Sequence, residues 1–269
     1  MTNILFWNTH NNIDVNPLLI NAILENNCDI VVLAEYKDNI NGLCNELLLH
    51  KKDFRSFIIN CDRIKIAADF EYKQEMIFDN DYVTIQNIKK LNKEFLLMAV
   101  HLPSKMYAGE DEQRAVAAQI LPEIQKAVAD VKHNNVVIVG DFNANPFEKV
   151  CINADCFHAV PNKNIAKKRK RSVNKKEYNI YYNPMWNFFG DNNNPNGTYY
   201  YPNSGINTYF WNIFDQVLLS PDIANNFDNY SMKILKSIDK ISLLDKSGIP
   251  DKKISDHLPI FFKIREELF

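Results

Sequence analysis

Polar side chains directly follow several of the most apolar segments of this sequence. In the stretch "VVIVGDFNANP", an aspartate, Asp141, and an amide, Asn143, come soon after four β-branched residues. In the same way, "ILFW" is followed by Asn8, "DIVVLA" by Glu35 and "FLLMAV" by His101. Each of these alone has an ordinary explanation as a cap or an exposed loop residue. Together they favour a site, because residues just past the carboxyl ends of strands that run the same way gather along one rim of a sheet.

Three further polar residues adjoin apolar segments: Asp215 in "FDQVLLS", and Asp256 and His257 in "SDHLP". With Glu35 and Asp141 the set contains four carboxylates, which repel one another and cannot all stay ionised without a compensating cation. Oxygen donors suit Mg²⁺ or Mn²⁺ better than Zn²⁺, which prefers Cys and His. Such a site supports attack of water on a phosphate ester, because a metal ion offsets the charge that grows on the phosphoryl and leaving oxygens.

The elements that must position these residues are short apolar runs and the helices between them. Several runs are apolar on successive residues, which is typical of strands covered on both faces. Helical patterns occupy 16–27, 39–50 and 110–132, the last opening with acidic residues that suit a helix N-terminus. We predict strands at 3–7, 29–34, 56–60, 75–78, 82–85, 95–100, 136–139, 214–220, 232–237 and 259–264. Strands alternating with helices predict an α/β or α+β fold with sheets packed inside helices.

Length and composition predict one folded domain that spans residues 1–269. Apolar residues make up 46% and charged residues 24% of the chain, which are ordinary values for a globular protein. The sequence contains no apolar stretch of 18 residues that would suggest a membrane span. Its first residues lack the basic region and the cleavage site of a signal peptide. The cysteines are odd in number and form no Cys-x-x-Cys pair, which favours reduced thiols in a cytoplasmic protein. They are Cys28, Cys44, Cys61, Cys151 and Cys156.

The ordered set of motifs resembles the endonuclease/exonuclease/phosphatase superfamily, of which pancreatic deoxyribonuclease is a familiar member. The segments that carry the resemblance are, in order, "FWN", "VVLAE", "VHLPS", "VGDFNANP", "FDQVLLS" and "SDHLP". They extend from Asn8 to His257, nearly the whole chain. The resemblance implies an α/β fold of the deoxyribonuclease I type, a four-layered α/β/β/α sandwich of two packed mixed β-sheets with outer helices. It also implies a Mg²⁺-dependent phosphodiesterase or phosphomonoesterase site at one rim.

The resemblance further implies roles for the positions that match the family pattern. Glu35 is expected to be the principal metal ligand, with Asn8 and Asp256 beside it, holding Mg²⁺ or, in its place, Mn²⁺. Asp141 and Asn143 resemble the pair that orients the attacking water and contacts the phosphoryl group.

Two histidines have implied catalytic roles. His257 resembles the histidine that contacts the scissile phosphate, and Asp215 is expected to hold it and make it more basic. Whether Asp141 or His257 takes the proton from water stays open, because the family pattern brings both within reach. His101 is expected to act on the leaving-group oxygen, and Glu75 is a candidate for the carboxylate that orients it, with Glu71 or no acid as alternatives.

Two departures from the AP endonucleases of the superfamily place this chain among its other branches. Those enzymes usually carry Asp two residues after the first Asn and Tyr at the position of His101, whereas this chain has His10 at the first position. The likeness is therefore closer to the deoxyribonuclease, sphingomyelinase and phosphotyrosyl-DNA hydrolase branches.

A basic run indicates the substrate class. Residues 162–176 carry eight Lys or Arg and no acid, so for a net charge of −2 the rest of the chain carries about −10. The run falls between the Asp141 and Asp215 motifs, and its flanking loop is expected beside the cleft, where it would bind the phosphates of a polyanion. A solvated loop is the alternative. The predicted nucleic-acid-binding residues are Ser104, Lys167, Lys168, Arg169, Lys170 and Arg171.

The preferred function is a Mg²⁺-dependent endonuclease that hydrolyses DNA, with nucleic acid as its partner and no membrane. The aromatic segment 183–212 could stack bases or wedge a groove, although packing at the sandwich edge is the simpler explanation. The alternatives are an enzyme acting on another phosphate ester, such as a phosphoinositide, sphingomyelin or RNA, and a catalytically inactive binding protein on the same fold. The inactive protein is disfavoured because every expected polar position is filled.

Overall fold

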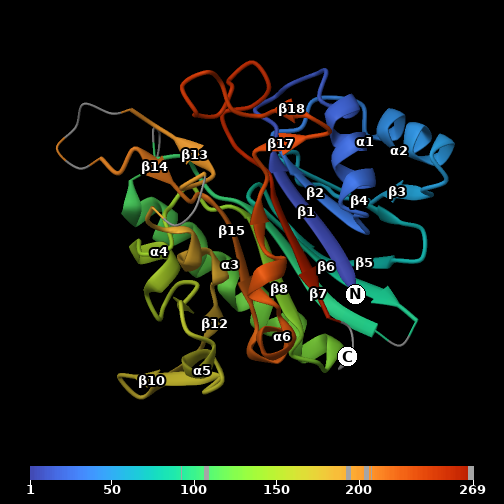
Figure 1. Cartoon of the computed structure of the whole chain (residues 1–269). Coiled ribbons are helices and arrows are strands. Elements are labelled where there is room, and N and C mark those ends of the chain that lie inside the picture. Colours follow the sequence, from blue (N-terminus) through green and yellow to red (C-terminus); the bar gives the residue numbers. More distant parts are fainter. Residues whose placement is uncertain (92, 106–108, 192–194, 203–205, 207, 266–269) are drawn as a thin grey trace.

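Two β-sheets form the centre of the protein, whose computed structural model describes residues 1–91, 93–105, 109–191, 195–202, 206 and 208–265 (Figure 1). The first sheet has six strands in the order β16-β19-β1-β2-β4-β3, with β1 and β2 parallel and the other neighbours antiparallel. The strands are β1 (Thr2–Asn8), β2 (Ile30–Ala34), β3 (Phe54–Ser56), β4 (Ile64–Asp69), β16 (Lys233–Ile234) and β19 (Ile260–Ile264).

The second sheet has seven strands in the order β5-β6-β7-β8-β15-β12-β9. The pairs β7–β8 and β12–β9 are parallel, and the remaining neighbours are antiparallel. Both sheets are therefore mixed. The strands are β5 (Lys73–Asp79), β6 (Val83–Lys90), β7 (Lys93–His101), β8 (Val136–Asp141), β9 (Ala159–Val160), β12 (Tyr181–Tyr182) and β15 (Asp215–Leu219).

Helices cover the outer faces of the two sheets (Figure 1). The apolar side chains of α1 (Asn16–Glu25) and α2 (Ile40–Leu49) join the core of the first sheet, and those of α3 (Glu110–Val131) join a separate core on the second. Asn39 caps α2 by accepting a hydrogen bond from the Gly42 backbone N, which satisfies one of the free donors of the first turn. Three shorter helices are α4 (Lys149–Ile152), α5 (Lys163–Ala166) and α6 (Pro221–Asn226).

Alternate side chains of the central strands build the layers between these elements. On β7, Leu97 and Ala99 join the core that contains the first sheet, whereas Leu96 and Met98 pack in the core under Ile120 of α3. Successive residues of a strand point to opposite faces, so this division means that both faces of the second sheet are covered. The layers run helix, sheet, sheet, helix, and the predicted four-layered sandwich is confirmed.

Most of the predicted elements are present, and two strand predictions are wrong. The segment 56–60 forms a strand only at its first residue, while β4 was not expected, because its sequence "IKIAAD" carries a lysine and small residues instead of a continuous apolar run. The segment 232–237 is split between β16 and β17 (Ser237–Ile238), which belong to different sheets.

In the described part of the chain, three antiparallel strand pairs lie outside the main sheets. They are β10 (Lys170–Val173) with β11 (Lys176–Asn179), β13 (Tyr199–Tyr200) with β14 (Trp211–Asn212), and β17 with β18 (Ile241–Ser242). Short 3-10 helices span Pro184–Phe188 and Asn229–Ser231. All five cysteines are unpaired, in keeping with reduced thiols. Among the described residues, no helix has the length and apolar character needed to cross a membrane.

Candidate active site

Three neighbouring strands of the second sheet bring chemically active side chains into one row. The register pairs His101, the last residue of β7, with Asp141, the last residue of β8, and pairs Asp141 with Asp215, the first residue of β15. His101 and Asp141 each lie two residues beyond an inward-facing residue, Ala99 and Val139 respectively. Because side chains alternate along a strand, the row points toward the first sheet.

Gly140 allows the strands to approach closely beside this row. It pairs with Val100 of β7, and a Cβ atom at Gly140 would lie 1.9 Å from the Val100 backbone oxygen. Backbone atoms of a central strand cannot move aside without loss of the sheet pairing. Only glycine therefore fits immediately before Asp141.

The first sheet contributes Asn8 and Glu35 from the ends of two parallel strands. Asn8 Nδ2 donates to Asp141 Oδ2 at 3.0 Å and, more weakly, to Glu35 Oε1 at 3.4 Å, while Asn8 Oδ1 accepts the His10 backbone N at 3.0 Å. Glu35 has a φ of 47°, in the left-handed region that few non-glycine residues adopt. Its backbone N donates to the Arg63 oxygen at 3.1 Å, which holds it there. Backbone outliers of this kind cluster at functional sites.

The His101 ring lies between the carboxylates of the two sheets. Its Nε2 is 3.4 Å from Glu35 Oε1 and 3.7 Å from Asp141 Oδ2. Burial lowers the pKa of His101 below its ordinary value, although both carboxylates oppose the shift. His101 is therefore neutral at neutral pH, and it can act as a hydrogen-bond donor or acceptor without adding charge to the site.

The prediction that Glu75 orients His101 is wrong. Glu75 pairs with Lys89 at 3.2 Å and lies opposite Asn87 in β6, well away from the end of β7. The alternative acid, Glu71, pairs with Lys90 at 2.7 Å. The carboxylates that do approach His101 come from other motifs, which are distant in sequence.

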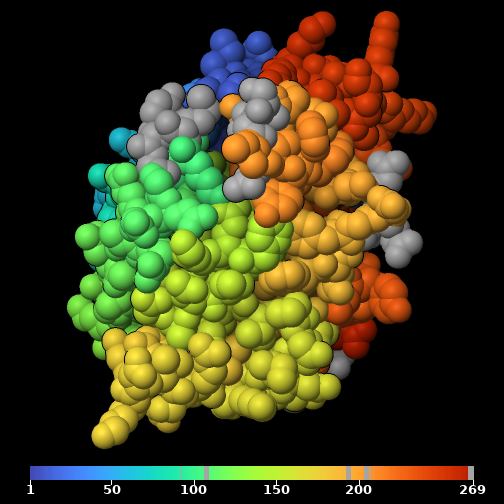
Figure 2. Space-filling model, turned by 90° about the vertical axis from the view of Figure 1, so that its left-hand side faces the viewer, coloured from blue at the N-terminus to red at the C-terminus, as the bar shows by residue number. Residues whose placement is uncertain are grey.

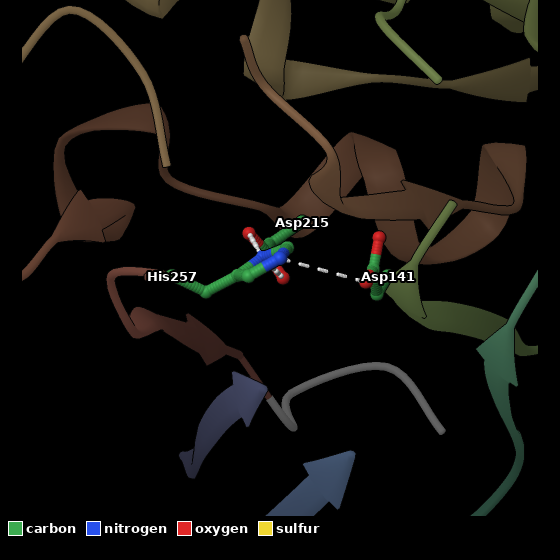
Figure 3. Close-up of side chains that lie close together, drawn as sticks. All are labelled: Asp141, Asp215 and His257. Atoms are coloured by element: carbon green, nitrogen blue, oxygen red, sulfur yellow. Dashed lines mark hydrogen bonds and ion pairs between the residues drawn. The ribbon is translucent and has the colours of Figure 1, made fainter. Parts of the chain in front are cut away.

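Asp215 and His257 form a buried pair at the base of the site (Figure 3). Asp215 Oδ2 lies 2.8 Å from His257 Nδ1 and its Oδ1 lies 3.1 Å from the same atom. Nε2, on the other side of the ring, is 3.9 Å from Asp141 Oδ2. Asp215 thus holds the ring so that Nε2 points toward Asp141; the expected contact between Asp215 and His257 is present, and their catalytic roles stay predictions.

The pKa of His257 is raised by its acidic neighbours. Burial by itself lowers the pKa of this imidazole, but the negative charges of Asp215 and Asp141 more than offset it, and the pKa lies above its ordinary value. Burial also raises the pKa of Asp215, against the opposing charge of His257. Because the imidazolium gains more from the pairing, the proton resides on His257 at neutral pH and the pair is ionic.

The segment that carries His257 is tied to the first sheet by two hydrogen bonds and braced by a third within the segment. Trp7 Nε1 donates to the His257 backbone oxygen at 2.9 Å, and Ser255 Oγ donates to the Asn8 backbone oxygen at 2.7 Å. The backbone N of His257 donates to Ser255 Oγ at 3.1 Å. These contacts hold "SDHLP" against the end of β1, next to Asn8.

Asn143 and Asp256 complete the set of predicted residues. The backbone N of Asn143 donates to Asp141 Oδ1 at 2.8 Å, and its side-chain Nδ2 donates to the Leu102 oxygen at 3.0 Å. Asp256 Oδ1 lies 3.1 Å from His10 Nδ1. The eight predicted catalytic and metal-binding residues therefore converge on one rim.

A cleft of about 860 Å³ opens above these residues. Its lining includes Glu35, Asp141, Asn143, Asp256 and His257, and also the predicted nucleic-acid contact Ser104. Asn8, His101 and Asp215 support these residues from beneath, where each is at least nine-tenths buried.

The basic run lies at the other end of the second sheet. Asp215 starts β15, whereas β12 pairs with the last residue of β15, Leu219, and the β10–β11 hairpin lies beyond β12 (Figure 1). Figure 2 shows this yellow hairpin at the bottom of the molecule and the orange β13–β14 segment near the top. Arg169 pairs with Asp222 in α6. The expected position beside the cleft is therefore wrong, and the role of the run in binding stays a prediction.

Two residues of the aromatic segment belong to the site and were not identified individually. Thr198 Oγ1 accepts the backbone N of Asp215 at 3.2 Å, and the Thr198 oxygen accepts the backbone N of Leu258 at 2.8 Å. The Tyr199 ring centroid lies 4.7 Å from that of His257. The segment's aromatic content was the available signal, but others of its rings, such as Phe188, pack against the core.

A family model described as endonuclease/exonuclease/phosphatase family matches residues 46–249. This chain belongs to that family. The matched region contains His101, Asp141 and Asp215, which form the row across the second sheet. Family members hydrolyse phosphoester bonds. No curated protein matches the sequence significantly.

Solved structures share the family fold at low sequence identity. The human Nocturnin catalytic domain has a TM-score of 0.59 at 15% identity, with 98% of this chain and 94% of that chain covered. Truncated TDP2 of Caenorhabditis elegans gives 0.57 at 13% identity, with 98% and 97% covered. An AP endonuclease from Archaeoglobus fulgidus gives 0.55 at 16% identity, with 98% and 99% covered.

Enzymes of this family generally use a divalent metal ion, and two groups of residues could hold one. Ligand atoms of Asp141, Asp215 and His257 lie within 4.8 Å of one another. However, Asp215 is fully buried and bonded to His257 Nδ1, so an ion there would have to displace that pair. Glu35 is 30% exposed in its side chain and lines the cleft, and its carboxylate suits a hard cation. The cleft-facing oxygen donors at Glu35 therefore fit a divalent ion better than the Asp141, Asp215 and His257 group does.

Replacement of Asp215 by Asn should lower the pKa of His257, because the imidazolium loses its closest negative charge. The measurement is an NMR titration of the histidine ring signals, with Asp222→Asn at the other end of the sheet as the matched control. An unperturbed imidazole has a pKa of about 6.5. In the wild-type protein, the His257 signal should stay at the chemical shift of the protonated ring well above that pH. A wild-type pKa at or below that value would contradict the ionic pair.

Proposed function

We propose that this protein is a Mg²⁺-dependent phosphodiesterase that acts as an endonuclease on DNA. The observation that carries the proposal is the convergence of the Asp215–His257 pair, Asp141 and the cleft-facing acid Glu35 on one rim. A cation beside carboxylates is the arrangement needed to bind a phosphate and activate water.

The metal ligands in this proposal are Glu35 and Asp256, with Asn8 adjacent. Mg²⁺ bound there, or Mn²⁺ in its place, would offset the negative charge that develops on the phosphoryl oxygens. Asn8 donates to both Glu35 and Asp141, so it fixes the two carboxylates relative to one another. Direct coordination of the metal ion by Asn8 stays a prediction.

Asp141 is the better candidate for the general base. His257 is protonated at neutral pH through its pairing with Asp215, so it donates a hydrogen bond to the phosphate and does not accept the proton of water. Asp141 accepts hydrogen bonds from Asn8 and from the Asn143 backbone, which aim its carboxylate into the cleft. Asn143 lies beside it in the cleft, in position to orient the phosphoryl group.

The nuclease assignment draws support from two structural relatives. One is the endonuclease domain of TRAS1, a telomere-specific non-LTR retrotransposon, with a TM-score of 0.55 at 12% identity. The other is the archaeal AP endonuclease. A single domain spanning residues 1–269 and a cytoplasmic location are also parts of the proposal.

A phosphodiester in a lipid is the second candidate substrate. The segment around β13 and β14 at the cleft exposes several apolar side chains, and such a hairpin can dip into a membrane surface. The exposed residues are Tyr201, Ile206, Tyr209 and Phe210. Hydrolysis of sphingomyelin or phosphoinositide vesicles is therefore the comparison for every nuclease assay.

Purified protein should nick supercoiled plasmid in the presence of Mg²⁺, and chelation should abolish the cleavage. Asp141→Ala and His257→Ala should each reduce the rate by about 10²- to 10⁴-fold, the usual contribution of a positioned acid or base. Leu91→Ala, at a side chain that is 92% exposed, is the control for handling and folding. Intact plasmid beside hydrolysed lipid vesicles would reject the endonuclease and favour the second candidate.

Neutralising the basic run should weaken binding to long DNA only. Lys167, Lys168 and Arg171 are changed to Gln, and Arg169 and Lys170 are kept because they pair with Asp222 and Glu177. If the run binds DNA, the slope of log affinity against log salt should fall by about 0.9 for each phosphate that the run no longer neutralises. Cleavage of an oligonucleotide that fills only the cleft should be unchanged, because the run lies at the other end of the sheet. An unchanged slope with long DNA would show that the run is a solvated hairpin that does not bind DNA.

A further inference from the structure

Aromatic rings form a continuous wall that leads away from His257. Tyr199 has its ring centroid 4.7 Å from that of His257. It stacks against Phe214 at 5.1 Å with 24° between the planes, and against Tyr201 at 6.4 Å with 21° between the planes. Tyr199, Tyr201 and Phe214 all line the cleft, and we call them the aromatic wall.

The aromatic wall ends in an exposed ring. Tyr201 is 43% exposed, whereas Tyr199 is partly buried against His257, so the wall passes from the catalytic residues to the solvent. Tyr209 also lines the cleft, with its ring tilted by 59° against that of Phe147 at a centroid distance of 5.0 Å, so it is not part of the stack. The near-parallel rings of the aromatic wall offer flat faces on which a planar group can stack.

The cleft has little positive charge to attract a polyanion. Each lysine in its described lining is already paired with an acid: Lys105 with Glu148, and Lys149 with Glu110 at 2.9 Å. No arginine occurs in that described lining. Arg63 stands nearby and holds its guanidinium over the Tyr82 ring at 5.1 Å.

These charges argue against binding of a duplex by its backbone. Duplex binding depends on Lys and Arg contacts to several phosphates on both sides of the cut bond. Here the acids Glu35, Asp141 and Asp256 line the cleft, its described lysines are paired with other acids, and the basic run lies at the other end of the sheet. Affinity must therefore come from another part of the substrate, and the rings of the aromatic wall are the available surface.

We propose that the cleft binds a nucleic-acid segment with unpaired bases, and that the base next to the scissile phosphate stacks on the aromatic wall at Tyr201. This substrate class rests on the proposed nuclease function. A base in a duplex has both faces covered by its neighbours, so it must first be unstacked, at a cost that a single strand avoids. Stacking is tolerant of sequence because every base has a flat π-face.

A membrane surface fits the aromatic wall less well. The Tyr199 and Tyr201 rings lie within 21° of parallel and line the cleft, which suits a planar group stacked on the aromatic wall. Insertion into lipid requires apolar side chains that project outward from a surface, whereas the three rings of the aromatic wall line the cleft. Vesicle binding is accordingly an outcome that would overturn the proposal.

The test is equilibrium binding of a fluorescent 12-nucleotide strand to the inactive His257→Ala variant in Mg²⁺, measured by fluorescence anisotropy. The same strand annealed to its complement, and phosphatidylcholine vesicles, form the comparison. The single strand should bind at least tenfold tighter than the duplex, with a shallow salt dependence. Adding Tyr201→Leu should weaken single-strand binding by about 5- to 100-fold, the loss expected for one stacked base. Tyr201→Trp should restore it.

The matched control is Tyr230→Leu, which removes a tyrosine that is 94% exposed and lies outside the cleft lining. It should leave the affinity unchanged. Equal binding of duplex and single strand, no binding of either, no effect of Tyr201→Leu, or tighter binding to vesicles would each overturn the proposal. Cleavage by the wild-type protein separates the two hypotheses: equal hydrolysis of both DNA forms rejects only the unpaired-base inference, whereas hydrolysis of neither rejects the nuclease itself.

Discussion

The site depends on the register that sets His101, Asp141 and Asp215 side by side at the ends of β7, β8 and β15. Directly paired residues on adjacent strands have their Cβ atoms roughly 5 Å apart, so two aspartates in one row repel each other strongly unless their charges are compensated. His257 neutralises Asp215 from inside the core, and hydrogen bonds from Asn8 and the Asn143 backbone stabilise the charge of Asp141.

The packing of the two sheets adds acids to this row. Inward-facing side chains of the second sheet meet the ends of β1 and β2, so Glu35 comes within 3.4 Å of His101. Neutral His101 cannot cancel that charge, and Asp256 brings another carboxylate to the same cleft. The excess of acid is costly for the folded protein by itself and becomes favourable when a divalent cation binds. A bound cation contacts only the scissile phosphate, and the lysines in the described lining of the cleft are already paired with acids. The aromatic wall therefore has an energetic part to play in substrate binding.

Much of the site could be predicted from sequence because strand periodicity and strand ends are local features. The apolar runs before Asn8, Glu35, His101 and Asp141 mark where strands end, and parallel strands end at the same rim. The sequence does not show at which end of the sheet a later segment rejoins it. The basic run lies between two site motifs in the chain, yet it follows β9, and the chain re-enters the sheet through β12 at the far end of β15.

Pairings between distant side chains were likewise beyond the sequence. The sequence marks Glu35 as the residue after a strand, but it does not show that the packing of the two sheets brings Glu35, and not Glu75 of β5, beside His101. Tyr199 was recognisable only as one ring among many in residues 183–212. Its position beside His257 arises from a bridge between two segments 58 residues apart, which requires the whole sandwich.

The most direct measurement of the central claim is the anomalous diffraction of crystals of this protein soaked in Mn²⁺. If crowding of acids at the rim is relieved by a cation, one anomalous peak should lie in the cleft against the Glu35 carboxylate, with the Asp215–His257 pair intact. A peak between Asp141, Asp215 and His257 with that pair broken, or no peak at the rim at saturating Mn²⁺, would contradict the account.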